Sequence, residues 1–284
     1  MAFSTAEPKA APARAGKRGG SPGRWVGFSA VALRRIGSIL IFFGLWYAAS
    51  FANAHLIRLF NPIMLPPPDA VLKVGIAMAM SGELMRHIVA SLSRVAQGFL
   101  IAALLGVLIG TLVGRSRVLE DLGEPAVELL RPIPPLAFLP MMVLWFGIGE
   151  ASKVGFIAYA AFFPIFTTTL EGIKYVDPLL IRAAASLGAS ERDIFRHVVL
   201  PAALPNILTG LRIGFGLSFF VIVAAEFIAA DSGLGFMIND ARTFFLVSNM
   251  LLGAAVIGGI GFLFNSGLRR LEARLLRWRK DARA

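Results

Sequence analysis

The sequence predicts an all-α integral membrane protein: a bundle of six spanning helices with a polar helical elbow between two of them. Hydrophobic residues make up 57% of the chain and the mean hydropathy is +0.73, outside the range of soluble globular domains. About six apolar segments of spanning length absorb nearly all of the 284 residues. The stretch from Asp177 to Pro205 is polar, although strongly apolar segments flank it.

Apolar runs of spanning length define the expected organisation of the chain. The predicted spans are Ile36–Ile57, Val95–Gly114, Pro135–Ile148, Val154–Gly172, Ile207–Ala229 and Leu246–Leu268. Around them we expect a disordered basic tail over residues 1–24, an interfacial lead-in over 25–35, a membrane domain over 36–268 with a polar loop at 173–206, and a basic tail over 269–284.

The distribution of charge predicts which side each loop faces. The net charge is +11, and basic residues gather at both ends of the chain. If both ends are cytoplasmic, the six-span alternation places 21 of the 28 Lys and Arg residues inside and six outside, with Arg212 within a span. Because cytoplasmic loops carry the excess of positive charge, both termini and loop 173–206 are predicted to be cytoplasmic. The same distribution argues against nucleic acid as a partner.

A cleaved signal peptide is the rival interpretation of the first span, since Ala52-Asn53-Ala54 resembles a cleavage site. The long lead and a segment of about twenty residues favour an uncleaved span. After it, Leu65-Pro66-Pro67-Pro68 predicts a stiff extended connector.

Helix-capping signals define the polar elbow. Asp177 is a predicted N-cap with Pro178 at the first helical position, and Gly188 is a predicted left-handed C-terminal cap. Ser190 and Asp193 form the capping pair of a second helix. Pro201 and Pro205 are expected to mark the turn into the next span.

Small residues recur at four-residue spacing on two spans: Gly106, Gly110 and Gly114 on the second, and Gly210, Gly214 and Ser218 on the fifth. Such faces allow helix backbones to approach closely in lipid. Contacts within the chain are favoured over contacts between two copies.

The fifth span also contains two ionisable residues, Arg212 and Glu226, which lie too far apart along one helix to pair with each other. Arg212 is expected to extend toward the cytoplasmic headgroups. Glu226 has two open interpretations: it borders an aqueous passage near the outer face, or it has a structural, hydrogen-bonded role.

The spacing of residues around Gly188 resembles the EAA loop of binding-protein-dependent ABC importer permeases. That motif reads Glu-Ala-Ala, three residues, Gly, nine residues, an aliphatic residue, one residue and Leu-Pro. Here the matching residues are Arg182, Ala183, Ala184, Gly188, Val198, Leu200 and Pro201, with arginine in place of the glutamate. Two further stretches, Arg131–Gly149 and Val223–Ile238, resemble the subgroup that serves nitrate, taurine and alkanesulfonate importers.

This resemblance implies a fold, a function and a set of partners. It implies a type I importer permease with a cytoplasmic coupling elbow, in which Arg182, Ala183, Ala184, Gly188, Ser190, Leu200 and Pro201 contact the ATPase. The expected assembly comprises a second copy of the chain, two ATPase subunits that bind ATP and Mg, and an external solute-binding protein, all at a bacterial inner membrane. The expected solute is small and anionic, such as a sulfonate, taurine or nitrate, and Glu226 is a candidate for its path.

An ion-coupled secondary transporter or a channel is the alternative function, although the chain shows no internal repeat of the kind many such transporters have. Enzyme activity is not expected. The chain has no Walker phosphate loop, no cysteine, and three scattered histidines without metal-ligand spacing, so no cofactor is predicted to bind it.

Overall fold

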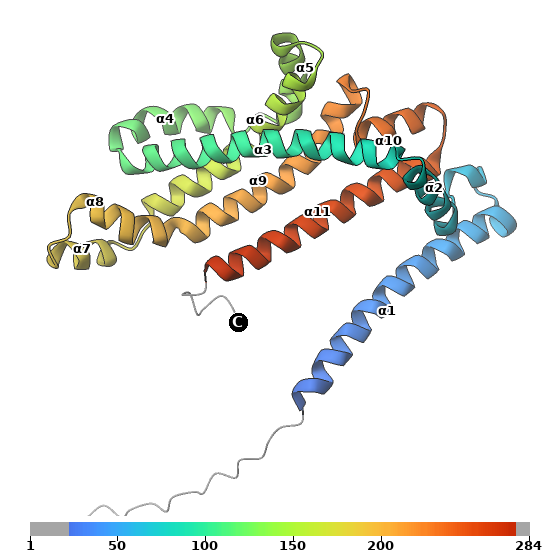
Figure 1. Ribbon diagram of the computed structural model, residues 1–284, viewed down its shortest axis with the longest axis horizontal. Coiled ribbons are helices and arrows are strands. Elements are labelled where there is room, and N and C mark those ends of the chain that lie inside the picture. Colours follow the sequence, from blue (N-terminus) through green and yellow to red (C-terminus); the bar gives the residue numbers. More distant parts are fainter. Residues whose placement is uncertain (1–22, 277–284) are drawn as a thin grey trace, which may run out of the picture.

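The computed structural model describes residues 23–276, and within that range it contains only helices, turns and loops. The α-helices are α1 Gly23–Ala52, α2 Pro68–Met80, α3 Glu83–Arg115, α4 Arg117–Leu130, α5 Pro135–Phe146, α6 Glu150–Lys174, α7 Pro178–Ser186, α8 Glu191–Ile194, α9 Leu200–Ala229, α10 Leu234–Thr243 and α11 Val247–Leu275 (Figure 1). Short π-helical turns occur at Asn53–Ile57 and Phe195–Val199, and a 3₁₀ turn at Pro62–Met64.

The core consists of α3, α6 and α9, which lie side by side along most of their length (Figure 1). Glycines of α3 fit against α6 in matching order: Gly98 meets Ile157, Gly106 meets Ile165 and Gly114 meets Ile173. Both sets of residue numbers rise together, so these two helices run parallel. A Cβ atom at Gly106 would lie 2.8 Å from Ile165 Cγ2, which leaves no room for a larger residue.

Helix α9 packs against α6 in the opposite direction. Gly214 lies against Ile165 and Ala161, whereas Asn206, nearer the start of α9, lies against Gly172, near the end of α6. Ser218 is fully buried and donates to the Gly214 carbonyl at 2.9 Å. The predicted within-chain use of the small-residue faces is therefore confirmed for both spans.

Parallel packing of α3 and α6 determines the number of membrane crossings. The chain between them, residues 116–149, must return to the side on which α3 begins. It does so through α4 and α5, which are bent by 98° relative to each other. Five helices of the described region are individually long and apolar enough to span a membrane, and there are six crossings if the bent pair is counted as one span.

The prediction that Pro135–Ile148 forms the third span by itself is wrong. Helix α5 has 12 residues, about 18 Å of rise, against the ~30 Å of a bilayer core. Pro134 and Pro135 interrupt the helical backbone before it, and Gly147 ends it with a φ of +77°. The crossing is shared with α4, whose amphipathic sequence gave no apolar run to detect.

Several helix boundaries in the structure also differ from the predicted span boundaries. Helix α3 begins at Glu83 rather than Val95, because its polar residues find partners inside the protein. Pro201 and Pro205 do not turn the chain: residues 191–228 form one continuous helical span, with the π-helical turn at Phe195–Val199 preceding Pro201. Helix α11 continues to Leu275, into the predicted C-terminal tail.

The N-terminal helix lies apart from the core (Figure 1). It begins at Gly23 and includes the predicted lead-in, while residues 1–22 and 277–284 lie outside the described part of the chain. Trp46 and Ser50 donate to the carbonyls of Pro66 and Leu65 at 3.1 and 2.7 Å. Pro67 has the predicted extended backbone, whereas Pro68, which was predicted to belong to the same connector, begins α2.

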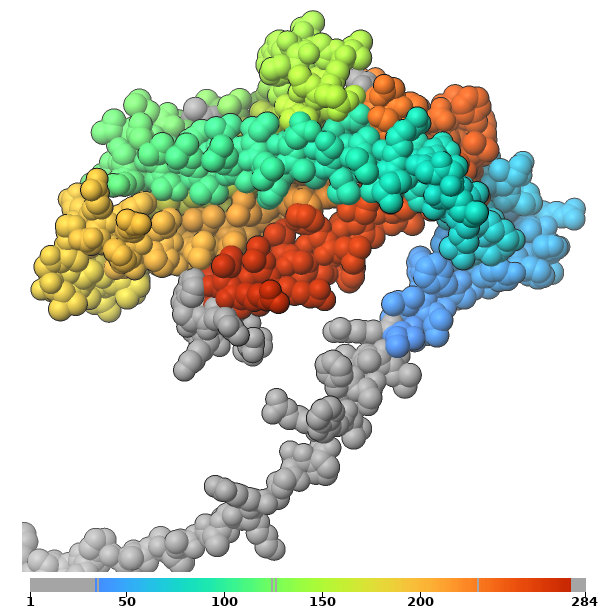
Figure 2. All heavy atoms as spheres, in the orientation of Figure 1, coloured from blue at the N-terminus to red at the C-terminus, as the bar shows by residue number. Residues whose placement is uncertain are grey.

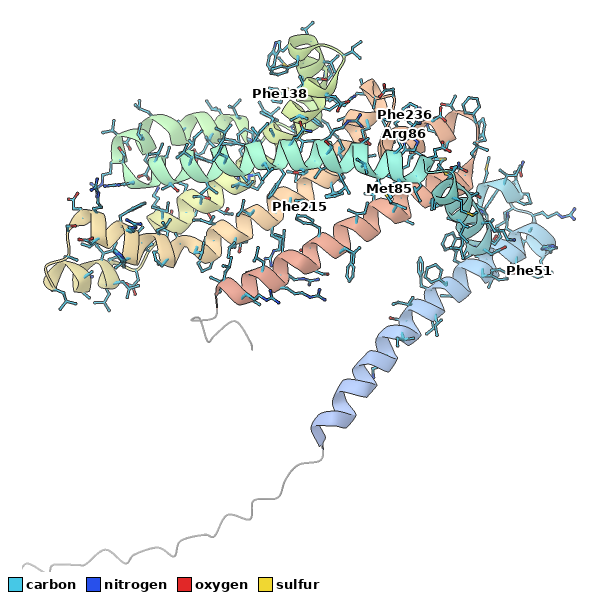
Figure 3. The ribbon with its side chains drawn as sticks, in the orientation of Figure 1. Phe51, Met85, Arg86, Phe138, Phe215 and Phe236 are labelled. Carbon is cyan, nitrogen blue, oxygen red and sulfur yellow. The ribbon has the colours of Figure 1, made fainter. Side chains whose placement is uncertain are left out.

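Helix α11 packs against α9 on the other side of the core. Phe215 of α9 points between its neighbours (Figure 3), with its ring stacked on Phe264 of α11 and edge-on to Phe99 of α3. Most of α11 is otherwise exposed, and a Cβ atom at Gly259 on this helix would meet no neighbouring element within 4 Å.

The glycine contacts predict a sharp difference between two equivalent substitutions. Gly106→Leu should lower the free energy of unfolding by about 1–3 kcal/mol or more, because α3 and α6 must separate to admit the side chain. Gly259→Leu is the matched control and should cost little, since its surroundings are open. Thermal unfolding of both variants in detergent checks this; equal losses would contradict the close packing of α3 on α6.

Candidate functional site

The elbow forms as its capping residues predict. Asp177 Oδ1 accepts from the Leu179 amide at 2.8 Å, with Pro178 at the first position of α7. Gly188 has a φ of +83°, and the Ser190 hydroxyl accepts from the Asp193 amide at 3.3 Å. Two short helices are thus held at a fixed angle by local hydrogen bonds.

The elbow is also attached firmly to the core. Val176, Val199 and Ala203 form a buried cluster with neighbouring residues of α6 and α9, and Ile181 of α7 packs against it. At the ends of the core helices, the Arg115 guanidinium lies 4.9 Å from the centre of the Phe195 ring, and Lys174 pairs with Glu120. A displacement of α7 and α8 must therefore move the ends of α3, α6 and α9.

The outer surface of the elbow is apolar and accessible. Leu187 is 89% exposed and Leu179 is 64% exposed. The elbow helices α7 and α8 lie at the end of the core away from α10 (Figures 1 and 2). Apolar side chains that are exposed on an otherwise polar elbow are typical of a docking surface.

The structure places the motif residues in two groups. Arg182, Ala183, Ala184, Gly188 and Ser190 lie on the elbow itself, and all but Ala184 are exposed. Leu200 and Pro201 begin α9, directly after the π-helical turn, and are also exposed. The Arg182 guanidinium donates to the carbonyl of Pro178 at 3.3 Å, a local bond that keeps it on α7.

A second cluster of functional interest surrounds Glu226, near the opposite end of the core. Its carboxylate is buried, with the residue 1% exposed, and accepts from the Ser91 hydroxyl at 2.7 Å and from Arg94 Nη1 at 2.7 Å. Arg94 also forms a two-point ion pair with Glu150, at 2.6 and 2.8 Å. Lys153 binds the same Glu150 carboxylate at 2.9 Å. This charge cluster joins α3, α6 and α9.

The charge cluster also holds the segment that leads into α10. Amides of Gly233, Leu234 and Gly235 donate to His87 Nδ1, Ser91 Oγ and Glu226 Oε2, at 3.0, 2.8 and 2.7 Å. The first amides of a helix have no partner within it, so these side chains act as caps supplied from α3 and α9.

The surroundings of Glu226 are those of the structural, hydrogen-bonded interpretation, because its carboxylate is buried and accepts from Ser91 and Arg94. Its partner Arg94 lies just before the predicted second span and was not predicted as a site residue. The signal that could have found it was Ser91 and Arg94, three residues apart on one helical face. Arg212 is likewise paired, with Glu272 of α11 at 3.1 Å.

A hollow of about 630 Å³ lies between the start of α5 and helices α6 and α9. Arg131, Thr167, Thr168 and Gly216 line it together with apolar side chains that include Phe163 and Phe220. The hollow is open to the outside of the chain rather than enclosed.

Neutralising Glu226 should destabilise the protein strongly. Removing one partner of a buried ion pair costs about 3–5 kcal/mol, so Glu226→Gln should lower the unfolding free energy by roughly that amount. Arg212→Gln breaks a partly exposed pair and should cost about 1 kcal/mol or less. Chemical unfolding of both variants makes the comparison, and equally mild effects would show that the charge cluster does not hold the segment that leads into α10.

Comparison with known proteins agrees with this architecture. Residues 102–277 match the family described as the binding-protein-dependent transport system inner membrane component. The chain is 43% identical to the taurine transport system permease protein TauC of Escherichia coli (strain K12), over 86% of this chain and 88% of that protein. It is 40% identical to the putative aliphatic sulfonates transport permease protein SsuC of Bacillus subtilis (strain 168), over 77% and 79%.

Solved structures show the same fold at lower identity. The MetNI methionine ABC transporter in an inward-facing conformation matches with a TM-score of 0.61 and 19% identity, over 69% of this chain and 98% of that one. An amino acid ABC transporter matches with a TM-score of 0.57 and 20% identity, over 71% and 96%. The expected type I importer permease fold is confirmed, and the chain belongs to the family of permease subunits of binding-protein-dependent ABC importers.

Proposed function

We propose that this permease couples ATP hydrolysis to solute import through the elbow formed by residues 177–196. The observation that carries the proposal is the exposed apolar surface of the elbow, built on helices that are packed into the ends of α3, α6 and α9. A partner that pushes on Leu179 and Leu187 displaces the core helices as well. Arg182, Ala183, Ala184, Gly188 and Ser190 form the contact, and Leu200 and Pro201 transmit it into α9.

The partners follow from this role. Two separate ATPase subunits bind ATP and Mg and each receives one elbow, and an external binding protein delivers the solute. The permease works as two copies in the lipid of a bacterial inner membrane. Six crossings place both termini on one side, and the excess of basic residues in the predicted inner segments makes that side the cytoplasm.

The solute passes between the two copies. Within one chain, the glycine contacts leave no passage between α3, α6 and α9. The open hollow beside α5, α6 and α9 supplies half of a path, and a second copy related by two-fold symmetry supplies the other half. Closure of the ATPases draws the two elbows together and opens this path outward. Glu226 supports the outer end of the path from within the core.

The solute is a small anion, a sulfonate or a related oxyanion. This follows from the relatives, which are named as permeases for taurine and aliphatic sulfonates, and from a further one, the bicarbonate transport system permease protein CmpB of Synechococcus elongatus. That protein is 41% identical over 67% of each chain.

Straining the elbow at Gly188 tests the coupling role. Gly188→Val places a β-branched residue at a φ of +83°, which costs more than about 1 kcal/mol and distorts the link between α7 and α8. We expect weaker ATPase association or hydrolysis without transport. Gly188→Asn is the control, since asparagine tolerates the left-handed conformation and the site has open space. Unchanged ATPase binding and transport in the valine variant would refute the coupling role.

The stoichiometry of the purified complex tests the shared path. Native mass measurement of the detergent-solubilised transporter should give two copies of this chain with two ATPase subunits. A single copy joined to a different permease would contradict the homodimer, and a complex without an ATPase would favour a secondary transporter.

A further inference from the structure

The hollow beside α5, α6 and α9 contains a positive charge that nothing in the described structure neutralises. Arg131 lies at the bend between α4 and α5, is exposed, and lines the hollow. The other lining residues are apolar or neutral, with Thr167 and Thr168 as the polar ones. Over residues 23–276, no carboxylate lines it.

Other cations of the core differ from Arg131 in having partners. Arg94 and Lys153 pair with Glu150, Arg212 pairs with Glu272, and Lys174 pairs with Glu120. Glu128 and Glu171 line a smaller adjacent hollow of about 120 Å³ that Arg131 also borders, yet neither forms an ion pair with it. Among the described side chains, the Arg131 guanidinium keeps all of its donors available.

The threonine hydroxyls of the hollow do not donate to an anion, because each already donates to a backbone carbonyl. Thr167 Oγ1 donates to the Phe163 carbonyl at 2.9 Å and Thr168 Oγ1 donates to the Pro164 carbonyl at 2.7 Å. Their hydrogens are used beside Pro164 inside α6, so their oxygens act only as acceptors toward the hollow. Arg131 is therefore the charged donor of the hollow.

The hollow reaches along α6 to Thr167, well before the end of that helix. Thr167 precedes the end of α6 at Lys174 by about 10 Å and follows its start at Glu150 by about 25 Å. Arg131 borders the hollow from the bend between α4 and α5, and it also borders the smaller hollow beside Lys174 at the end of α6. An unpaired guanidinium is costly in a lipid environment, so such residues face water-filled cavities or partners. The hollow is then an aqueous compartment with a positive potential.

We propose that Arg131 is a transient binding site for the transported oxyanion, with one guanidinium contributed by each copy. This inference rests on the proposed path between two copies. The planar guanidinium matches a sulfonate or carboxylate group through two parallel hydrogen bonds. Two such charges facing one compartment exclude cations, and a single charged donor per copy binds weakly enough to release the solute onward.

The absence of cysteine from the sequence allows a direct test with charged thiol reagents. Thr167→Cys is introduced into the full transporter and treated with the anionic sulfonatoethyl methanethiosulfonate and the cationic trimethylammonioethyl methanethiosulfonate. Met80→Cys, 84% exposed on α2, gives the reference ratio of the two rates. Relative to it, we expect the anionic reagent to be favoured roughly ten-fold at Thr167→Cys, because a positively lined cavity concentrates anions.

Second-site variants assign this preference to one residue. Adding Arg131→Gln should abolish it, and adding Arg131→Lys should preserve most of it. Equal rates of the two reagents, a preference that survives Arg131→Gln, or failure of both reagents to react in every nucleotide state would each overturn the proposal.

Uptake by proteoliposomes containing the complete transporter completes the test. Arg131→Gln should reduce ethanesulfonate or taurine uptake roughly ten-fold while ATPase association stays normal, and Arg131→Lys should restore part of it. Unchanged uptake would overturn the proposed role. Failure of the coupling role would appear separately, as normal ATPase binding together with normal transport by Gly188→Val, and a wrong stoichiometry would appear in the mass measurement without altering the reagent rates.

Discussion

Close contact between glycine-bearing helices is the constraint on which the rest of this structure depends. Gly98, Gly106 and Gly114 let α3 meet the isoleucines of α6 directly, and Gly214 does the same for α9. In lipid there is little hydrophobic gain in joining helices, so this fit supplies the packing energy. It also fixes directions: once α3 and α6 run parallel, the bent pair of α4 and α5 must carry the chain back across the membrane.

Rigid packing of the core determines how the proposed mechanism transmits motion from the elbow. The elbow is attached at one end of α3, α6 and α9, and the charge cluster around Glu226 joins the same three helices toward the other end. Helices held at both ends transmit a displacement as one body, because packed cores shift between arrangements rather than deform gradually. The freedom needed for transport then lies between two copies of the chain, where the structure leaves an open hollow.

Local signals in the sequence predicted local structure well. The caps at Asp177, Gly188 and Ser190 depend on a few neighbouring residues, and each formed as expected. Predictions failed where distant residues decide the outcome. The continuation of α9 through Pro201 depends on a preceding π-helical turn, and the charge on Glu226 is balanced by Arg94, 132 residues earlier in the chain. Neither is visible in a hydropathy pattern.

Two arginines in the same bundle show how burial separates structural from functional charge. Arg94 is almost completely buried. Its guanidinium donates to the carboxylates of Glu150 and Glu226 and, at 2.5 Å, to the Ser232 carbonyl, so its charge holds helices together. Arg131 is exposed to a hollow and pairs with no described carboxylate. A charge that is already neutralised cannot select a solute, whereas an unpaired charge beside water can. The anion selectivity of the proposed path is therefore expected at the bend between α4 and α5, where the regular packing of the core ends.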